Sequence, residues 1–143
     1  MSALVTPASG PKSLTTCVSV IAVAHLLLNI AHGLAHRQLG VGLAIRDSIF
    51  VIAVVLVSPL AAMTLVWTAA KRFGLVLLSF SMFGSLLFGW YHHFLAMSPD
   101  HVHSQPSTAW GMTFVLTAYC LLFTEAIGTY AGFHFLWIAK GTS

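Results

Sequence analysis

Four long apolar stretches dominate this chain and fix what it can fold into. They cover about residues 14–36, 48–70, 73–97 and 110–139. Each reaches or exceeds the roughly 20 residues that a helix needs to cross a lipid bilayer. We therefore expect an all-α polytopic membrane protein that crosses the bilayer four times.

The scarcity of charge supports a lipid environment. Only 6% of the 143 residues are charged and 58% are hydrophobic, whereas a soluble domain carries about a quarter charged residues. The basic residues are scattered, and no basic run points to nucleic acid. The expected partner is therefore the lipid bilayer, and nucleic-acid binding is not expected.

The connections between the stretches are short and predict the topology. They cover residues 37–47, 71–72 and 98–109, and short links make consecutive helices antiparallel neighbours. The prediction is an up-down bundle of four transmembrane helices that forms a single domain, residues 14–140. Residues 1–13, which are rich in Pro and Gly, are expected to form a flexible cytoplasmic tail.

Basic residues predict the orientation of this bundle. The alternating topology gives one side four basic residues and the other side two: Lys12, Lys71, Arg72 and Lys140, against Arg37 and Arg46. Cytoplasmic loops carry the excess of Lys and Arg in membrane proteins. We expect both termini in the cytoplasm and a multi-pass protein of the bacterial inner membrane.

The segment His25–His36, HLLLNIAHGLAH, is the most unusual part of the first stretch. On a helix, His25, Asn29, His32 and His36 fall on one face. Polar side chains inside an apolar helix are costly unless they have partners. This face is therefore expected to point into the bundle.

Histidines at one membrane face form the candidate metal site. The first and third helices end on the same side, which brings His32 and His36 to the depth of His92, and the next loop adds Asp100, His101 and His103. A His-x3-His pair on a helix suits chelation of one metal ion. His93, offset by 100° from its neighbour, is expected at the membrane interface. The alternative is a hydrogen-bonded polar core without metal.

The expected cofactor is a transition metal ion (zinc, copper or iron) or a b-type haem. Imidazole suits these ions. A b-type haem would take His32 or His36 as one axial ligand and His92 as the other.

A second polar group is expected near the bilayer midplane. Glu125 is the only acidic residue well inside an apolar stretch, and His25 lies at a similar depth on the first helix. We expect a hydrogen-bonded His25–Glu125 pair with Asn29 beside it. The alternative is a Glu125 that bonds to Asn29, Thr129 or a backbone carbonyl.

Two other functions compete with metal or haem binding. The HGLAH, YHH and HVH motifs loosely resemble the histidine boxes of membrane di-iron desaturases and hydroxylases, but the HxxHH boxes of that family are absent. Catalysis is therefore not the expectation, and no catalytic residue is assigned. The other alternative is proton-coupled transport or a role as an accessory subunit of a larger membrane complex, in either case through the His25–Glu125 pair. The expected assembly is a homo-oligomer or a larger membrane complex.

Overall fold

The computed structural model describes residues 11–140, and these residues form an all-helical bundle. Four helices are long and apolar enough to cross a membrane: Ser13–Leu39, Ile45–Leu65, Lys71–Leu95 and Ala109–Ile138. The predicted fold class of four transmembrane helices is confirmed. Residues 1–10 of the predicted tail, residues 1–13, lie outside the described residues. Its last three residues, 11–13, are helical.

Two of the spans change helix type along their length. The first is a single α-helix, α1 (Pro11–Leu39), and the fourth is α5 (Ala109–Lys140). The second span consists of α2 (Ile45–Phe50), the π-helical η1 (Val51–Val57) and α3 (Ser58–Leu65). The third consists of α4 (Lys71–Trp90) and the π-helical η2 (Tyr91–Leu95), and a short 3-10 helix, η3 (Val102–Ser104), lies in the following loop.

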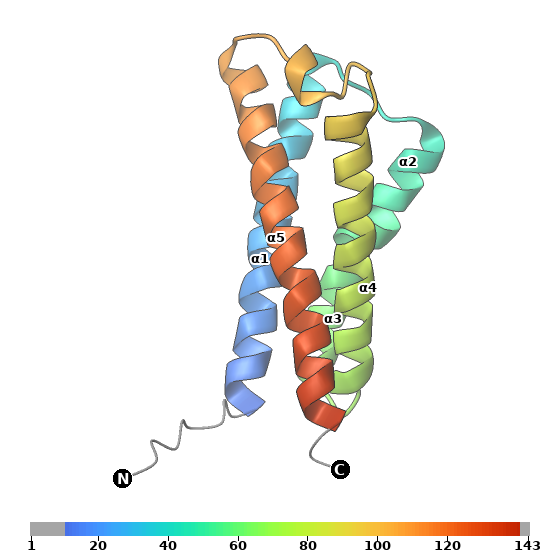
Figure 1. Ribbon diagram of the computed structural model, residues 1–143, viewed down its shortest axis with the longest axis vertical. Coiled ribbons are helices and arrows are strands. Elements are labelled where there is room, and N and C mark those ends of the chain that lie inside the picture. Colours follow the sequence, from blue (N-terminus) through green and yellow to red (C-terminus); the bar gives the residue numbers. More distant parts are fainter. Residues whose placement is uncertain (1–10, 141–143) are drawn as a thin grey trace.

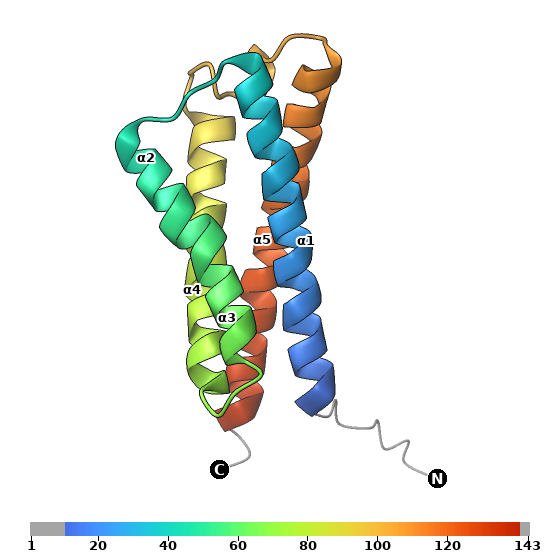
Figure 2. The same ribbon diagram turned by 180° about the vertical axis from the view of Figure 1, so that it is seen from behind.

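The helices alternate in direction, so α1 begins and α5 ends at the same end of the bundle (Figure 1). The helix α5 packs against both α1 and α4, and α3 packs against α4. The α2 end of the second span leans away from the other helices, as Figure 2 shows from behind. None of the residues of α2 is buried.

The link between the second and third spans is longer than predicted. The second helix ends at Leu65 rather than residue 70, and Lys71 and Arg72 lie in the first turn of α4 instead of forming the link. Hydrogen bonds hold the intervening turn, because Thr68 Oγ1 donates to the Leu65 carbonyl at 2.8 Å and Trp67 Nε1 donates to Ser19 Oγ at 3.0 Å.

Apolar packing fills the half of the bundle nearest the termini. Leu78 and Met82 of α4 are fully buried there against Val18 of α1 and Ala62 of α3. Large apolar side chains also cover the outside of the bundle, where Phe80 is 62% exposed and Phe123 66% exposed. An apolar exterior of this kind suits a lipid environment, because exposing these side chains to water would be costly and exposing them to lipid tails is not.

Small residues allow α4 and α5 to pack closely. A Cβ added at Gly132 would overlap Ser79 Oγ and lie 3.2 Å from Ser79 Cα, and one added at Gly128 would lie 2.9 Å from Met82 Cγ. Packed transmembrane helices use small residues in this way.

We therefore expect Gly132→Ala to destabilise the bundle by about 1–2 kcal/mol, since overpacking outweighs the gain in helix propensity. The matched control is Gly33→Ala, because a Cβ at this helical position meets nothing within 4 Å. Reversible unfolding in mixed detergent micelles measures both variants. Equal stability of the two would contradict the close α4–α5 contact.

Candidate metal centre

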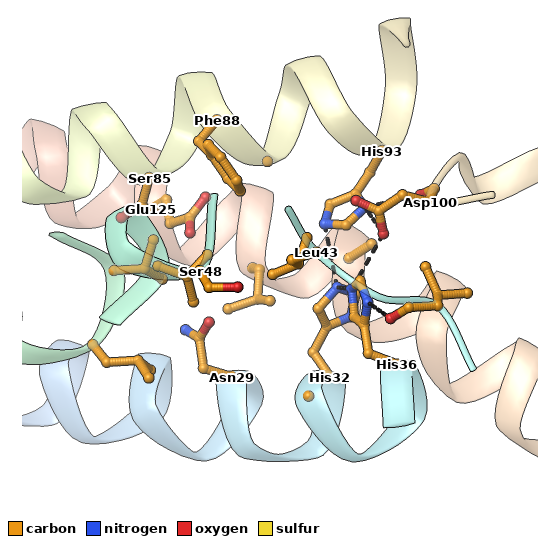
Figure 3. A pocket seen from close by; sticks show the side chains of 18 of the residues that line it. Asn29, His32, His36, Leu43, Ser48, Ser85, Phe88, His93, Asp100 and Glu125 are labelled. Atoms are coloured by element: carbon orange, nitrogen blue, oxygen red, sulfur yellow. Dashed lines mark hydrogen bonds and ion pairs between the residues drawn. The ribbon is translucent and has the colours of Figure 1, made fainter. Parts of the chain in front are cut away.

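Three histidines meet at the end of the bundle away from the termini. The helix α1 supplies His32 and His36, one turn apart on the same face. The π-helical η2 supplies His93. Figure 3 shows these three rings, which we call the histidine trio, pointing toward one another at one end of a cavity.

The spacing within the histidine trio matches ligands around one ion. His32 Nε2 lies 3.2 Å from His93 Nε2 and 3.2 Å from His36 Nε2. One ligand atom from each of the three rings lies within 4.8 Å of the others. Nitrogens arranged tetrahedrally at a Zn–N length of about 2.05 Å lie about 3.3 Å apart. The trio has the ligand type and the spacing to hold a metal ion.

The hydrogen bond of His32 to α5 fixes which ring nitrogen carries the proton. His32 Nδ1 lies 2.8 Å from Thr117 Oγ1. The Thr117 hydroxyl has one proton, which it directs to the backbone carbonyls of Thr113 at 2.6 Å and Phe114 at 3.0 Å. His32 Nδ1–H is therefore the donor to Thr117, and in the neutral ring Nε2 is left with a lone pair.

Backbone carbonyls fix the other two rings in the same tautomer. His36 Nδ1 lies 3.2 Å from the Val41 carbonyl, and His93 Nδ1 lies 3.0 Å from the Asp100 carbonyl. A carbonyl only accepts, so each Nδ1–H is the donor.

In its neutral form, each of the three rings directs an Nε2 lone pair toward one small volume. Lone pairs that face one another at 3.2 Å repel unless a proton or a cation lies between them. Metal-binding histidines commonly have their second ring nitrogen fixed by such a carbonyl or hydroxyl acceptor. The hydrogen bonds therefore prepare the trio for a cation.

Asp100 adds a negative charge beside the trio. Its Oδ1 lies 3.2 Å from His36 Nε2 and 3.4 Å from His93 Nδ1. Both carboxylate oxygens are buried, and neither has a hydrogen bond to another described residue. Burial alone would raise the pKa of Asp100, but the adjacent His93 ring and the other two rings of the trio hold it below its ordinary value. A buried carboxylate without hydrogen bonds is costly, and a bound cation would remove that cost.

Phe114 of α5 forms the apolar floor of the trio. It is fully buried, and its ring centroid lies 4.6 Å from that of His32, 4.8 Å from that of His36 and 5.3 Å from that of His93. This packing limits the rotamers of all three histidines and keeps water from one side of the site.

The structure reverses the expected roles of His92 and His93. His93 is buried and joins the trio, whereas His92 is half-buried and its ring packs at a tilt against that of Phe88, with centroids 4.3 Å apart. The cause is η2, because a π-helix has more residues per turn than an α-helix and shifts the inward face by about one residue. The row of residues four apart that includes Ser85 and Gly89 therefore continues to His93.

The other predicted histidine ligands do not reach the trio. His101 is buried in the loop, where its Nε2 lies 3.3 Å from the Phe94 carbonyl and its Nδ1 accepts from the His103 backbone N–H at 3.1 Å. His103 is exposed. His101 holds the loop in shape, and the loop in turn positions Asp100.

The predicted midplane residues lie together near the centre of the bundle. His25 Nε2 is 3.2 Å from Glu125 Oε1, and both side chains are buried. Asn29 Nδ2 lies 3.1 Å from the same His25 nitrogen and donates to the His25 carbonyl at 2.9 Å. This polar group is separate from the histidine trio, and the cavity runs between the two (Figure 3).

Sequence reasoning places Asp100 in the loop on the same side as the histidines without assigning it as a ligand, and it misses Thr117. Thr117 gave no signal, because a threonine within an apolar helix ordinarily bonds to its own backbone.

A search of protein-family models, curated proteins and solved structures finds no match to this chain. The chemistry of the site therefore rests on its own geometry.

We predict that Thr117→Val lowers metal affinity about 10- to 100-fold, because His32 loses the partner that orients its ring and fixes its tautomer. The control is Thr113→Val on the same helix, where the hydroxyl bonds only to the Ala109 carbonyl. Competition titration with a chelator measures both. Equal affinities in the two variants would remove Thr117 from the site.

Proposed function

We propose that this membrane protein binds a single transition metal ion through Nε2 of His32, His36 and His93. Asp100 supplies the fourth ligand or balances the charge of the ion. The observation that carries the proposal is that the Nδ1 atom of each ring is bonded elsewhere. The neutral rings then present three Nε2 lone pairs to one volume, with His32 Nε2 3.2 Å from Nε2 of both His36 and His93.

Zinc is the ion that this ligand set suits best. Three histidines with one further position are typical of zinc sites that keep a place for water or substrate. Copper and iron also accept imidazole ligands. The group contains no thiolate, which argues against a site selective for soft ions.

A bare ion fits the site better than a b-type haem does. A b-type haem with two histidine ligands occupies the space between the two axial imidazole rings. The rings of His32 and His93 are already in edge-to-face contact, with centroids 4.8 Å apart. The macrocycle could enter only if α1 and η2 moved apart.

The same reasoning favours one ion over a di-iron centre. The trio gathers three histidines, and His101 is bound to the loop backbone. The other potential ligands close to the trio are Asp100 and His92, whose Nδ1 lies 4.0 Å from Asp100 Oδ2. Together with the trio they leave too few groups for two irons.

A through-membrane proton or ion path is the weaker proposal. In such a path, the His25–Glu125 pair would be the site that binds the proton or ion at the bilayer midplane. Between this pair and the end of the bundle where α1 begins, the core is mainly apolar and includes Ile21, Leu78 and Met82. The buried Ser79 in this region donates its hydroxyl proton to the Leu75 carbonyl at 2.8 Å. This packing favours a site that opens to one side.

We further propose that the termini face the cytoplasm of a bacterial inner membrane and that the metal site lies near the outer face. Lys71 and Arg72 begin α4 at the end of the bundle where α5 ends (Figure 1). The excess of basic residues at that end is typical of the cytoplasmic side.

The test is the metal content of purified protein together with its visible absorption. We expect about one zinc-class ion per chain and no Soret band, and His32→Ala should reduce the ion to background because two ligands no longer chelate tightly.

The matched control is His103→Ala, which removes an exposed histidine from the same end of the molecule and should retain the ion. A Soret band, or equal metal content in both variants, would contradict the proposal.

A further inference from the structure

A cavity of about 410 Å³ begins at the histidine trio and extends toward the midplane. Its walls are mainly apolar and come from all four spans, with Val51 and Val55 from η1, Phe88 from α4, and Ala118 and Leu121 from α5. Ligand-binding cavities typically occupy about 300–1,000 Å³ and have apolar walls with a few polar groups. In size and lining this cavity is suited to a small organic molecule.

The polar groups of this cavity are concentrated at its two ends. The outer end holds the histidine trio, Asp100 and Arg37, and the inner end holds Asn29, Ser48, Ser85 and Glu125. Figure 3 shows this separation, with Phe88 and Leu43 between the two polar ends.

Gly89 marks the short passage that joins the two ends. A Cβ at this position would lie 3.8 Å from Glu125 Oε2 and 3.9 Å from His93 Cδ2. The inner carboxylate and the ring of a candidate metal ligand therefore face the same small space. A molecule the size of one substituted ring can reach both.

The chemistry of the two ends differs. A metal ion and the guanidinium of Arg37 would favour an anionic, oxygen-bearing group at the outer end. At the inner end, Glu125 Oε1 is engaged by His25, and Oε2 is the atom that faces Gly89. Ser85 Oγ donates to the Ser81 carbonyl at 2.8 Å, so its lone pairs remain free to accept. The inner end is thus rich in acceptors and favours a hydroxyl or amine donor.

We propose that this cavity binds a small two-ended molecule: an anionic, metal-coordinating group at one end, one apolar ring, and a hydrogen-bond donor at the other. The inference rests on the proposed metal site and adds the class of ligand that this site accepts. The metal holds the anionic group, the apolar walls hold the ring, and Glu125 accepts from the donor.

Two aromatic hydroxamates test this inference. Both 4-hydroxybenzohydroxamate and benzohydroxamate carry the metal-coordinating group, and only the first carries the donor. Full-length protein in detergent is loaded with cobalt(II), whose visible spectrum changes when a fourth or fifth ligand binds. We expect both probes to shift the spectrum, with the 4-hydroxy compound binding about tenfold more tightly because of its hydrogen bond to Glu125.

Variants separate the two ends of the ligand. Glu125→Gln should remove the preference for the 4-hydroxy compound and leave benzohydroxamate affinity unchanged within about twofold. Gly89→Ala should weaken both probes at least tenfold and retain the metal, because its methyl group makes only ordinary contacts at 3.8 and 3.9 Å and fills the passage. The control is Gly42→Ala, where a Cβ meets nothing within 4 Å.

Metal analysis before and after probe addition distinguishes the outcomes. Protein that holds no cobalt overturns the proposed metal site together with this inference. Protein that holds cobalt but gives no spectral shift, or loses cobalt to the probe, overturns the inference alone. Equal probe affinity in Gly89→Ala and Gly42→Ala places binding outside the cavity and also overturns it.

Discussion

The site depends on three hydrogen bonds, each of which uses Nδ1 of a histidine and so directs Nε2 of that ring toward the other two rings. His32 donates to the Thr117 hydroxyl, His36 to the Val41 carbonyl and His93 to the Asp100 carbonyl. The three acceptors come from α5, from the loop after α1 and from the loop after η2. In an apolar bundle such polar groups have few other partners, so the hydrogen bonds are both costly to break and specific in direction. The spacing of the three Nε2 atoms is therefore a consequence of how the half of the bundle away from the termini closes.

The two halves of the bundle have different tasks. The half nearest the termini is filled with apolar side chains and held by the close approach of α4 to α5. The other half contains the cavity, the histidine trio and two π-helical segments. A π-helical turn widens the helix and is common at functional sites. Here η2 turns His93 inward, and η1 provides part of the cavity wall beside the exposed α2.

Much of the fold follows from hydropathy alone. In a bilayer, a chain with so little charge and four apolar stretches forms four membrane-spanning helices, because these satisfy the backbone hydrogen bonds within each stretch. The helical spacing of His32 and His36 also follows directly from an α-helix. The exchange of His92 for His93 could not be predicted, since ideal helical periodicity contains no information on where a π-turn will form. Asp100 reaches the site because the loop is held in shape by the bonds of His101 and by Gln105, whose Nε2 donates to the Pro99 carbonyl at 2.7 Å. Such long-range loop geometry is not encoded in local spacing.

X-ray absorption spectroscopy of the zinc-loaded protein tests the central claim most directly, because it reports the ligand atoms of the ion itself. The account predicts a first shell of nitrogen and oxygen at about 2.0–2.1 Å, together with the multiple-scattering pattern of three imidazoles. A shell with sulfur at about 2.3 Å, or fewer than two imidazoles, would contradict a metal centre formed by His32, His36 and His93.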